Sequence, residues 1–388
     1  MEKRVGLILT GGGARAAYQV GVLKAIAEFL PRRAHNPFPV ICGTSAGALN
    51  AAALAINAQN FRKGVHYLDN IWKNFHANQV YRTDVVGVFN NSMLWLAGLI
   101  LSGLGINKLK QISFLNNSPL LELLEEILPC EKIQDSIDAG LLHAIGITAS
   151  GYGSGQSVTF YQGVEQLEPW RRTRRVGVPT KIGISHLLAS AAIPFIFPAV
   201  RIHREYFGDG SMRQIAPISS VLHLGATRVL VIGITANVTT ERSTRNGHDE
   251  YPPLAQIAGH ALNSIFLDSM EVDLERVYRL NELASMLPED ALARADIKNV
   301  DVLVVAPSQS VEKIAERHVA ELPWTIRLLL RLVGATRYSG ASLVSYLLSE
   351  KSFCRALIDL GYQDAMQRRD EILKFLDVQP EQDTEMPQ

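Results

Sequence analysis

The chain has 388 residues, and its 38 basic and 38 acidic side chains give a formal net charge of zero. That balance argues against nucleic acid as a partner, because a nucleic-acid binder normally carries a basic excess. Apolar residues make up 47% of the chain and charged residues 20%, close to globular averages, which argues against a disordered protein.

The cysteine content and the N-terminus bear on the compartment. The three cysteines are odd in number and far apart, as is typical of reduced thiols in a reducing compartment. The apolar run Val5–Leu9 is too short for the core of a signal peptide. We therefore expect no export by that route, and a cytoplasmic protein with peripheral contact to a membrane.

The first 57 residues predict a strand–helix–strand–helix order. Val5–Thr10 is a continuous apolar run, typical of a strand buried on both faces, and three glycines follow it. A helix is predicted over 14–30, where Pro31 ends it. A second strand over 39–43 turns into an Ala-rich helix that ends near residue 57. This order is typical of an α/β protein with a mainly parallel sheet.

The remaining chain continues the pattern of strands and helices. Further strands are predicted over 144–149, 158–161, 206–208, 229–235 and 302–306. Helices are predicted over 61–76, 119–128, 185–192, 216–225, 254–280, 310–319, 341–360 and 362–376, and a polar loop over 237–252. Because strands run past residue 300, we favour one α/β domain. It comprises a core over 1–235, a largely helical extension over 236–376 and a disordered tail over 377–388.

Gly43-Thr44-Ser45-Ala46-Gly47 is a G-x-S-x-G sequence placed between a predicted strand and a predicted helix. A serine on such a sharp turn is strained and exposed at the carboxyl edge of the sheet, and the small residues Gly43 and Gly47 let strand and helix approach. The helix N-terminus also favours negative charge there. We interpret Ser45 as a nucleophile; the alternative is a tight turn in which Ser45 only caps the helix.

A serine nucleophile needs a base, and the histidines are poor candidates. Only His248, His260 and His318 follow a plausible late acid, in a polar loop, a helix and a charged helix respectively, and we favour solvated histidines. No metal-binding spacing such as H-E-x-x-H is present, so no metal site is predicted. The other candidate is Asp209, between two glycines after a short apolar strand; spacing alone leaves it open as a base or as an ordinary turn residue.

Gly11, Gly12 and Gly13 follow the first strand and leave backbone N–H groups unobstructed at the start of a helix. Such a loop can bind an anion or an oxyanion. It also fits the dinucleotide fingerprint G-x-G-x-x-A, but that function requires an acid at the end of the second strand, where none stands. Arg15 is either a phosphate contact or a surface residue.

Together, these elements resemble the patatin-like phospholipase family. Gly11–Ile26 is similar to the first block of the family, Gly43–Ala53 to its nucleophile elbow, Leu188–Pro198 to its A-S-x-A-x-P-x-x-F-x-P block and Phe207–Pro217 to its catalytic-aspartate block. The resemblance covers roughly residues 5–235. Two departures are Ser211, where Gly or Ala is more frequent, and Ala16, where Gly is frequent; serine is also small, so the first departure is compatible with the match.

The resemblance implies a three-layer α/β/α fold with a helical C-terminal extension, and a serine lipid acyl hydrolase without cofactor. Ser45 would attack the acyl ester of a phospholipid or another lipid, Asp209 would serve as the base, and the Gly11–Gly13 loop with the region of Arg15 would form the oxyanion hole. Two alternatives stay open: a dinucleotide-binding enzyme that uses the glycine loop, and a catalytically silent lipid-binding protein of this fold.

Four long segments lack charged residues, and they predict either buried core or a lipid-facing surface; they are 34–61, 85–107, 139–164 and 182–200. Segment 93–105 is the most hydrophobic, but thirteen residues are too few to span a membrane. We interpret it as a lid or membrane-dipping segment, with a buried core helix as the alternative. Residues 170–175 combine Trp170 with four arginines, which would attract anionic head groups or form a solvated loop.

Overall fold

The computed structural model describes residues 3–84, 113–235, 253–265, 269–288, 299–332, 334 and 341–378. Within these ranges one sheet of ten strands has the order β10-β9-β1-β2-β3-β4-β6-β5, and β8 pairs with β3 and β7. The strands are β1 (Val5–Leu9), β2 (Val40–Thr44), β3 (Ala144–Gly151), β4 (Ser157–Gly163), β5 (Trp170–Arg172), β6 (Arg175–Pro179), β7 (Val200–Ile202), β8 (Glu205–Asp209), β9 (Arg228–Ile232) and β10 (Asp301–Val305).

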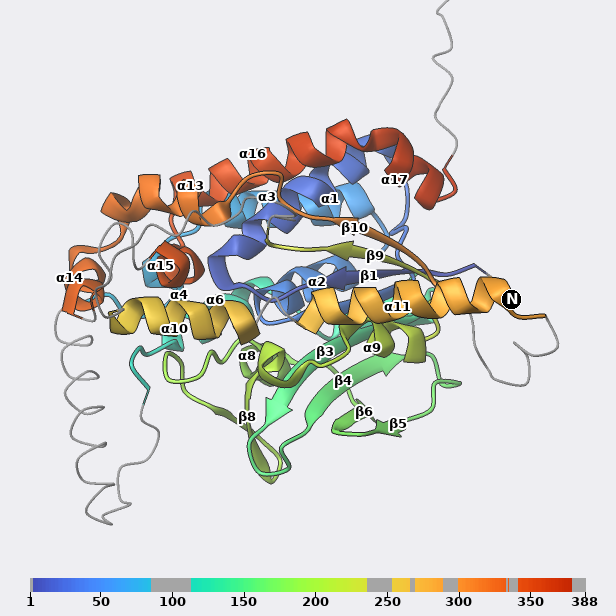
Figure 1. Ribbon diagram of the computed structural model, residues 1–388, viewed down its shortest axis with the longest axis horizontal. Coiled ribbons are helices and arrows are strands. Elements are labelled where there is room, and N and C mark those ends of the chain that lie inside the picture. Colours follow the sequence, from blue (N-terminus) through green and yellow to red (C-terminus); the bar gives the residue numbers. More distant parts are fainter. Residues whose placement is uncertain are drawn as a thin grey trace, which may run out of the picture.

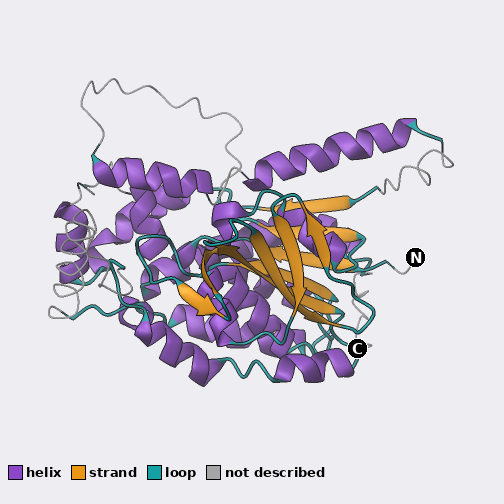
Figure 2. Cartoon of the chain, turned by 90° about the horizontal axis from the view of Figure 1, so that it is seen from below, coloured by secondary structure: helices purple, strands orange, loops and turns teal. Residues whose placement is uncertain are grey.

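Helices cover both faces of this sheet (Figures 1 and 2). The α-helices are α1 (Ala17–Phe29), α2 (Ala46–Ile56), α3 (Phe61–Lys73), α4 (Ala77–Val80), α6 (Ser118–Ile127), α7 (Lys132–Asp138), α8 (Ile184–Ser190), α9 (Pro217–His223), α10 (Leu254–Asn263), α11 (Ser269–Met286), α13 (Val311–His318), α14 (Trp324–Leu332), α15 (Ala341–Leu347), α16 (Lys351–Gln367) and α17 (Arg369–Phe375). Short 3₁₀ helices are η1 (Gly13–Ala16), η2 (Gly210–Arg213) and η4 (Val319–Glu321).

The alternation of side chains along the central strand explains the three layers. Leu7 and Leu9 of β1 join the core under α1, α2, α3 and α16, whereas Ile8 joins a second core under α9 and α11. Figure 1 shows α16, α1 and α3 on one side of β1, β9 and β10, with α9 and α11 on the other. The predicted α/β/α fold with a mainly parallel sheet and C-terminal helices is confirmed.

The sheet is parallel through β10, β9, β1, β2 and β3, and mixed beyond β3. Two strands share one side of β3. The parallel strand β2 pairs along its first half up to Thr148, and the antiparallel strand β8 pairs along its second half from Ala149. The carboxyl ends of β2 and β8 therefore meet head to head beside β3.

The C-terminal helices pack into the same body. Strand β10 extends the sheet by pairing with β9, and α16 lies along α1 (Figure 1). A Cβ at Gly361 of α16 would lie 2.2 Å from the carbonyl oxygen of Tyr18 on α1. The two helix backbones thus approach so closely that only glycine fits at this position.

Some predicted boundaries are wrong. The pattern predicted a break near residue 361, but Gly361 lies inside α16, where it serves helix packing. The break falls instead at 348–350, where the Glu350 carboxylate accepts the N–H of Ala77 and bonds His76. The predicted helix over 254–280 is two helices, α10 and α11, and residues 266–268 between them lie outside the described residues.

Several predictions concern residues that the structure does not describe. The hydrophobic segment 93–105 and the polar loop 237–252 lie outside the described residues, as does most of the tail beyond 378. In the described ranges, no helix combines the length and the hydropathy that crossing a bilayer requires.

Candidate active site

Ser45 has the backbone geometry of a strained turn between β2 and α2. Its φ is 54° and its ψ is −130°, and its side chain makes no capping hydrogen bond to α2. A Cβ at Gly47 would lie 2.2 Å from the carbonyl oxygen of Leu9, and one at Gly43 would lie 2.6 Å from Cα of Ala48. Because Gly43 and Gly47 have no side chains, α2 packs closely against the edge of the sheet. The Ser45 hydroxyl does not cap this helix. A left-handed φ is costly for a residue with a side chain and is typical of functional sites.

Ser190, which the sequence analysis did not single out, holds this turn. The Ser45 N–H donates to Oγ of Ser190 at 2.8 Å, and this hydroxyl donates in turn to the carbonyl oxygen of Thr148 at 2.6 Å. Ser190 is fully buried. Its position inside the small-residue block 188–198 was the available signal, because a serine in a buried run must have hydrogen-bond partners.

The head-to-head meeting of β2 and β8 places Asp209 beside Ser45. Thr44 lies opposite Thr148, and Asp209 lies opposite the next residue, Ala149. The Asp209 N–H also donates to the carbonyl oxygen of Ala192 at 2.8 Å. Although the two residues are 164 positions apart in the sequence, pairing with one strand brings them together.

The Asp209 carboxylate is completely buried and only half satisfied. Oδ1 accepts the N–H of Ser211 at 2.9 Å, whereas Oδ2 has no hydrogen bond of ordinary geometry among the described residues. Burial raises the pKa of Asp209 to about 6, although the neighbouring Ser45 and Ser211 favour the charged form and oppose the rise. A carboxylate with such a pKa is a stronger base than an exposed aspartate, and its unpartnered oxygen can accept a proton.

The glycine loop lies across from Ser45. Gly13 has a φ of 56°, and a Cβ there would lie 2.3 Å from the carbonyl oxygen of Tyr346. Gly13 and Ala14 line the same cavity as Ser45 and Ala46. Because the first N–H groups of a helix lack intrahelical acceptors, the starts of η1 and α2 both bring potential donors to this cavity.

The cavity at Ser45 is lined almost entirely by apolar side chains. Besides the residues named above, it is lined by Leu49, Trp72, Phe75, Val80, Tyr81, Leu120, Ala191, Ile193, Phe197, Tyr346, Leu347 and Ser349. A second apolar cavity lies between α2, α3 and α6 and reaches Ile127 and Leu128. The two share the walls Leu49, Trp72, Phe75 and Leu120, so apolar space extends from Ser45 into the helical layer.

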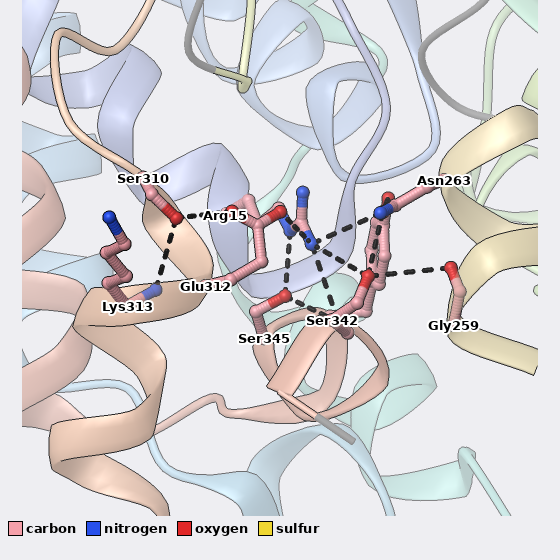
Figure 3. A network of polar contacts seen from close by, with 9 residues as sticks. Arg15, Gly259, Asn263, Ser310, Glu312, Lys313, Ser342 and Ser345 are labelled. Carbon is pink, nitrogen blue, oxygen red and sulfur yellow. Dashed lines mark hydrogen bonds and ion pairs between the residues drawn. The ribbon is translucent and has the colours of Figure 1, made fainter. Parts of the chain in front are cut away.

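The Arg15 side chain does not line this cavity; it is fully buried among the C-terminal helices (Figure 3). Nη2 of Arg15 lies 3.0 Å from Oε1 of Glu312, and Nε donates to Oγ of Ser345 at 2.9 Å. Its guanidinium carbon lies 4.1 Å from the centre of the Tyr346 ring. The expectation of a surface position for this side chain is therefore wrong, and its guanidinium is bonded to protein groups rather than free for a phosphate. The part of the Arg15 region in an oxyanion hole stays a prediction.

No described histidine lines the cavity. His260 is exposed on α10, His318 is 3.0 Å from Glu321, and His248 lies outside the described residues. Likewise, the described part of the chain holds no group of three His, Cys, Asp or Glu side chains that could bind a metal ion.

The arginine cluster at 170–175 is a β-hairpin formed by β5 and β6. Trp170 lies between the rings of Tyr161 and His223, at centroid distances of 5.1 and 5.0 Å, so it is held by protein side chains. Arg171, Arg172 and Arg174 are exposed.

Comparison with known proteins matches the part of the chain that contains Ser45 and Asp209. The family model of the patatin-like phospholipases matches residues 7–222. Among curated proteins, a "cGAMP-activated phospholipase" of Pseudomonas aeruginosa (strain BWHPSA011 / Pa011) is 26% identical over 217 residues, which are 56% of this chain and 55% of that protein. "Lysophospholipase nte1" of Aspergillus terreus (strain NIH 2624 / FGSC A1156) is 50% identical over 56 residues, which are 14% of this chain and 3% of that protein.

The chain thus spans about half the length of the first of these relatives and a small part of the second. Among solved structures, VipD from Legionella pneumophila is 14% identical, with a TM-score of 0.32 over 99% of this chain and 82% of that chain. This TM-score is too low to carry an argument about the site.

Proposed function

Because the chain belongs to the patatin-like phospholipase family, we propose that it is a serine lipid acyl hydrolase that works with a Ser45–Asp209 dyad. One observation carries the proposal: β2 and β8 meet head to head along β3, which puts the strained Ser45 beside a buried carboxylate with one unpartnered oxygen. Phospholipase and lysophospholipase relatives support a lipid ester as the substrate.

The reaction starts when Oγ of Ser45 attacks the carbonyl carbon of the acyl ester and Asp209 takes the hydroxyl proton. The tetrahedral intermediate then collapses: the bond to the alcohol breaks, and Asp209 returns its proton to the leaving oxygen. Water attacks the acyl-Ser45 ester with Asp209 again taking a proton. The second collapse frees the fatty acid and gives that proton back to Ser45. No histidine or cofactor is needed in any step.

The oxyanion of each intermediate would be bound by backbone N–H groups of Gly12 and Gly13. A further donor would be the N–H of Ala46 at the start of α2, which the sequence analysis did not name; Ala46 lines the same cavity as Ser45. In hydrolases with a nucleophile elbow, the residue after the nucleophile commonly supplies such a donor. Losing one donor of this kind typically costs ~10²–10³ in rate.

The apolar cavities favour a long acyl chain as the group transferred to Ser45. An acyl chain attached to Ser45 would pass Leu49 and Phe75 and extend toward Leu128, between α2, α3 and α6. The lining there is apolar, which suits methylene groups and excludes a head group. The head group and the alcohol would then face the open side of the site.

Both alternatives have less support. A dinucleotide site requires an acid after β2, but β2 ends with Cys42-Gly43-Thr44. The glycine loop of such a site contacts phosphate groups, whereas here Gly13 lines an apolar cavity. A silent lipid-binding protein would have no use for a buried, half-satisfied carboxylate beside a strained serine, because both features cost stability.

A fluorophosphonate probe tests the proposal. We expect covalent labelling of the wild type at Ser45, no labelling of Ser45→Ala, and hydrolysis of phospholipid, lysophospholipid or monoester substrates that persists after dialysis against a chelator. A folded wild type that is neither labelled nor hydrolytic would reject the proposal. If Asp209→Asn stays active, the base lies elsewhere, and the histidines should be replaced in turn.

A further inference from the structure

Arg15 follows the glycine loop but faces away from the reaction. It lies in η1, two residues after Gly13, and its side chain is completely buried between α10, α13 and α15 (Figure 3). All three helices lie outside the segment 7–222 that matches the family model. The loop proposed to bind the oxyanion is thus tied to a part of the chain whose role is open.

The ties run to each of the three helices. Glu312 of α13 pairs with Nη2 of Arg15, and Ser345 of α15 accepts from Nε. Weaker contacts of Nη2 reach Oδ1 of Asn263 on α10 at 3.5 Å and the carbonyl oxygen of Ser342 at 3.4 Å. Glu312 is itself oriented by the hydroxyl of Ser310, 2.9 Å from Oε2. Figure 3 shows this guanidinium at the centre of the network.

The same region also touches the main chain of the loop. Gly13 packs against the backbone of Tyr346, and the Tyr346 ring stacks under the Arg15 guanidinium. The Tyr346 hydroxyl donates to Oδ1 of Asn263 at 2.9 Å. Tyr346 also lines the cavity at Ser45, together with Leu347 and Ser349. The short segment 346–349, at the end of α15 and just beyond it, therefore contacts the loop from behind and forms a wall of the cavity in front.

The stability of the fold does not by itself explain why the charged Arg15 side chain is buried between these helices. Burying a guanidinium is costly, and buried ion pairs replaced by apolar residues often leave stability unchanged or improved. Here Nη1 of Arg15 is buried with no hydrogen-bond partner in the described part of the chain, so the cost is only partly offset. What the network does achieve is a fixed direction for η1, because a forked cation bonded on several sides cannot rotate.

We propose that Arg15 is a positioning residue: by pairing with Glu312 and stacking on Tyr346, it lets the C-terminal helices fix the backbone N–H groups of the glycine loop in the orientation that binds the oxyanion. This inference rests on the proposed hydrolase function. It assigns to α13 and α15 the task of completing a site whose nucleophile and base come from the first 210 residues.

The test compares Arg15→Gln, Arg15→Lys and Glu312→Gln with a matched control, Arg62→Gln. Arg62 donates to carbonyl oxygens of Ala27 and Leu30, so it also joins helices by a guanidinium, and it does not line the cavity. We expect kcat to fall about 10- to 100-fold in Arg15→Gln with KM little changed, since a misplacement of about 1 Å can cost 10²-fold. Glu312→Gln should show a smaller loss, Arg15→Lys partial recovery, and Arg62→Gln none.

A second readout separates positioning from general damage. Each variant is assayed on a short-chain oxygen ester and on its thiono analogue, whose sulfur accepts hydrogen bonds poorly. The preference for the oxygen ester reports the oxyanion donors, so it should shrink in the Arg15 variants and stay at the wild-type value in Arg62→Gln.

Three outcomes are informative. Folded Arg15→Gln and Glu312→Gln variants with wild-type kcat, or with a lowered kcat and an unchanged ester preference, overturn the proposal. If Arg15→Gln does not fold, Glu312→Gln and Ser345→Ala provide the same comparison, and the same two results overturn it. A wild type that is not labelled by the fluorophosphonate overturns the hydrolase function first, so the two failures are distinguishable.

Discussion

The two ends of the chain build the site by different physical means. The first 210 residues place Ser45 and Asp209 through the register of β2 and β8 along β3. The C-terminal helices form the wall behind the glycine loop through side-chain packing at Tyr346 and Arg15. Strand register is discrete, because a slip by one residue turns every side chain over. Helix packing can shift by fractions of an ångström, so we expect the first region to decide whether there is chemistry and the second to tune its rate.

The largest effect should come from the register-placed carboxylate. Asp209→Asn should lower kcat by about 10⁴-fold or more, as single losses from a nucleophile–base unit do. Ser45→Ala should fall to a similar level, and the double variant should be little worse than either, because the residues of the proposed dyad would act as a unit. Steady-state hydrolysis of a soluble ester measures this. Losses that multiply in the double variant would mean that the two residues act independently.

The same substitution should raise stability above neutral pH. The folded pKa of Asp209, about 6, lies above that of an aspartate in the unfolded chain, so ionising it opposes folding. This cost is absent below pH ~4, where the group is protonated in both states, grows up to about pH 6 and is constant above. The asparagine in Asp209→Asn never ionises, so denaturant titrations at pH 8 should find the variant more stable by about 1–3 kcal/mol, with the gap closing near pH 4. A variant less stable than wild type at pH 8 contradicts a carboxylate whose ionisation is opposed by burial.

The difference between short-range and long-range contacts explains how much of this candidate site the sequence predicts. Local motifs located Ser45, the glycine loop and the strands β1 and β2, because a turn and a buried strand are short-range features. They left Asp209 undecided until the family resemblance was considered, because its pairing with Ala149 is a long-range contact. Arg15 was misplaced for the same reason: a basic residue in a loop is usually exposed, and its partners Glu312 and Ser345 are about 300 positions away. Gly361 suggested a break because the pattern alone cannot separate a packing glycine from a helix end.

Two glycines at the boundary between the regions should respond differently. Gly13→Ala adds a Cβ 2.3 Å from the carbonyl oxygen of Tyr346 at a φ of 56°, and should move the glycine loop. We expect a loss of about 10²-fold in kcat, comparable to losing one oxyanion donor. Gly361→Ala adds a Cβ 2.2 Å from the carbonyl oxygen of Tyr18, and neither residue lines the cavity, so it should cost stability, about 1–3 kcal/mol, with kcat retained.

Kinetics and thermal melting of both glycine variants decide the comparison. If Gly361→Ala lowers kcat as much as Gly13→Ala does at a temperature where both are folded, the extension affects the site as a whole rather than through the loop.

The pH dependence of the wild type should report the base. In the proposed mechanism Asp209 must be ionised to take the Ser45 proton, and burial raises its pKa to about 6. The value of kcat/KM should therefore be level above about pH 7 and fall tenfold per pH unit well below 6. Fluorophosphonate labelling rates should follow the same curve. A midpoint near 4 would place the base in a solvated position, and a midpoint near 7 that disappears on replacing a histidine would identify a different base.

The cavity between α2, α3 and α6 should set the preferred acyl length. Ala53 lines this cavity but not the cavity at Ser45, so Ala53→Leu should fill space away from the nucleophile. Long-chain esters should lose about tenfold in kcat/KM, which corresponds to about two methylene groups that no longer find apolar contact. Butyrate esters should be unaffected and serve as the internal control. An equal loss for short and long chains would place the acyl chain elsewhere.

The smallest effect should come from Phe195, which lies in the chain between two residues that line the cavity. It is 78% exposed with a left-handed φ of 67°, and its neighbours Ile193 and Phe197 line the cavity. An exposed phenyl ring held in a strained conformation beside an apolar site suits contact with a lipid surface. Phe195→Asp should lower hydrolysis of vesicle phospholipid about three- to fivefold, part of the transfer free energy of a phenylalanine, and leave a soluble ester unaffected.

Tyr278→Asp is the matched control for Phe195. Tyr278 is 52% exposed on α11, the helix on the opposite face of the sheet from α1 and α16. Vesicle sedimentation and hydrolysis are measured for both variants. If both lose equally, the added charge repels anionic vesicles wherever it stands. If neither loses, the lipid surface does not meet the protein at Phe195. A loss confined to Phe195→Asp would mean that substrate enters from the side of the cavity where β2, β8 and the glycine loop converge. Ser45 and Asp209, placed by strand register, and the wall formed by the C-terminal helices would then act on the same bound lipid.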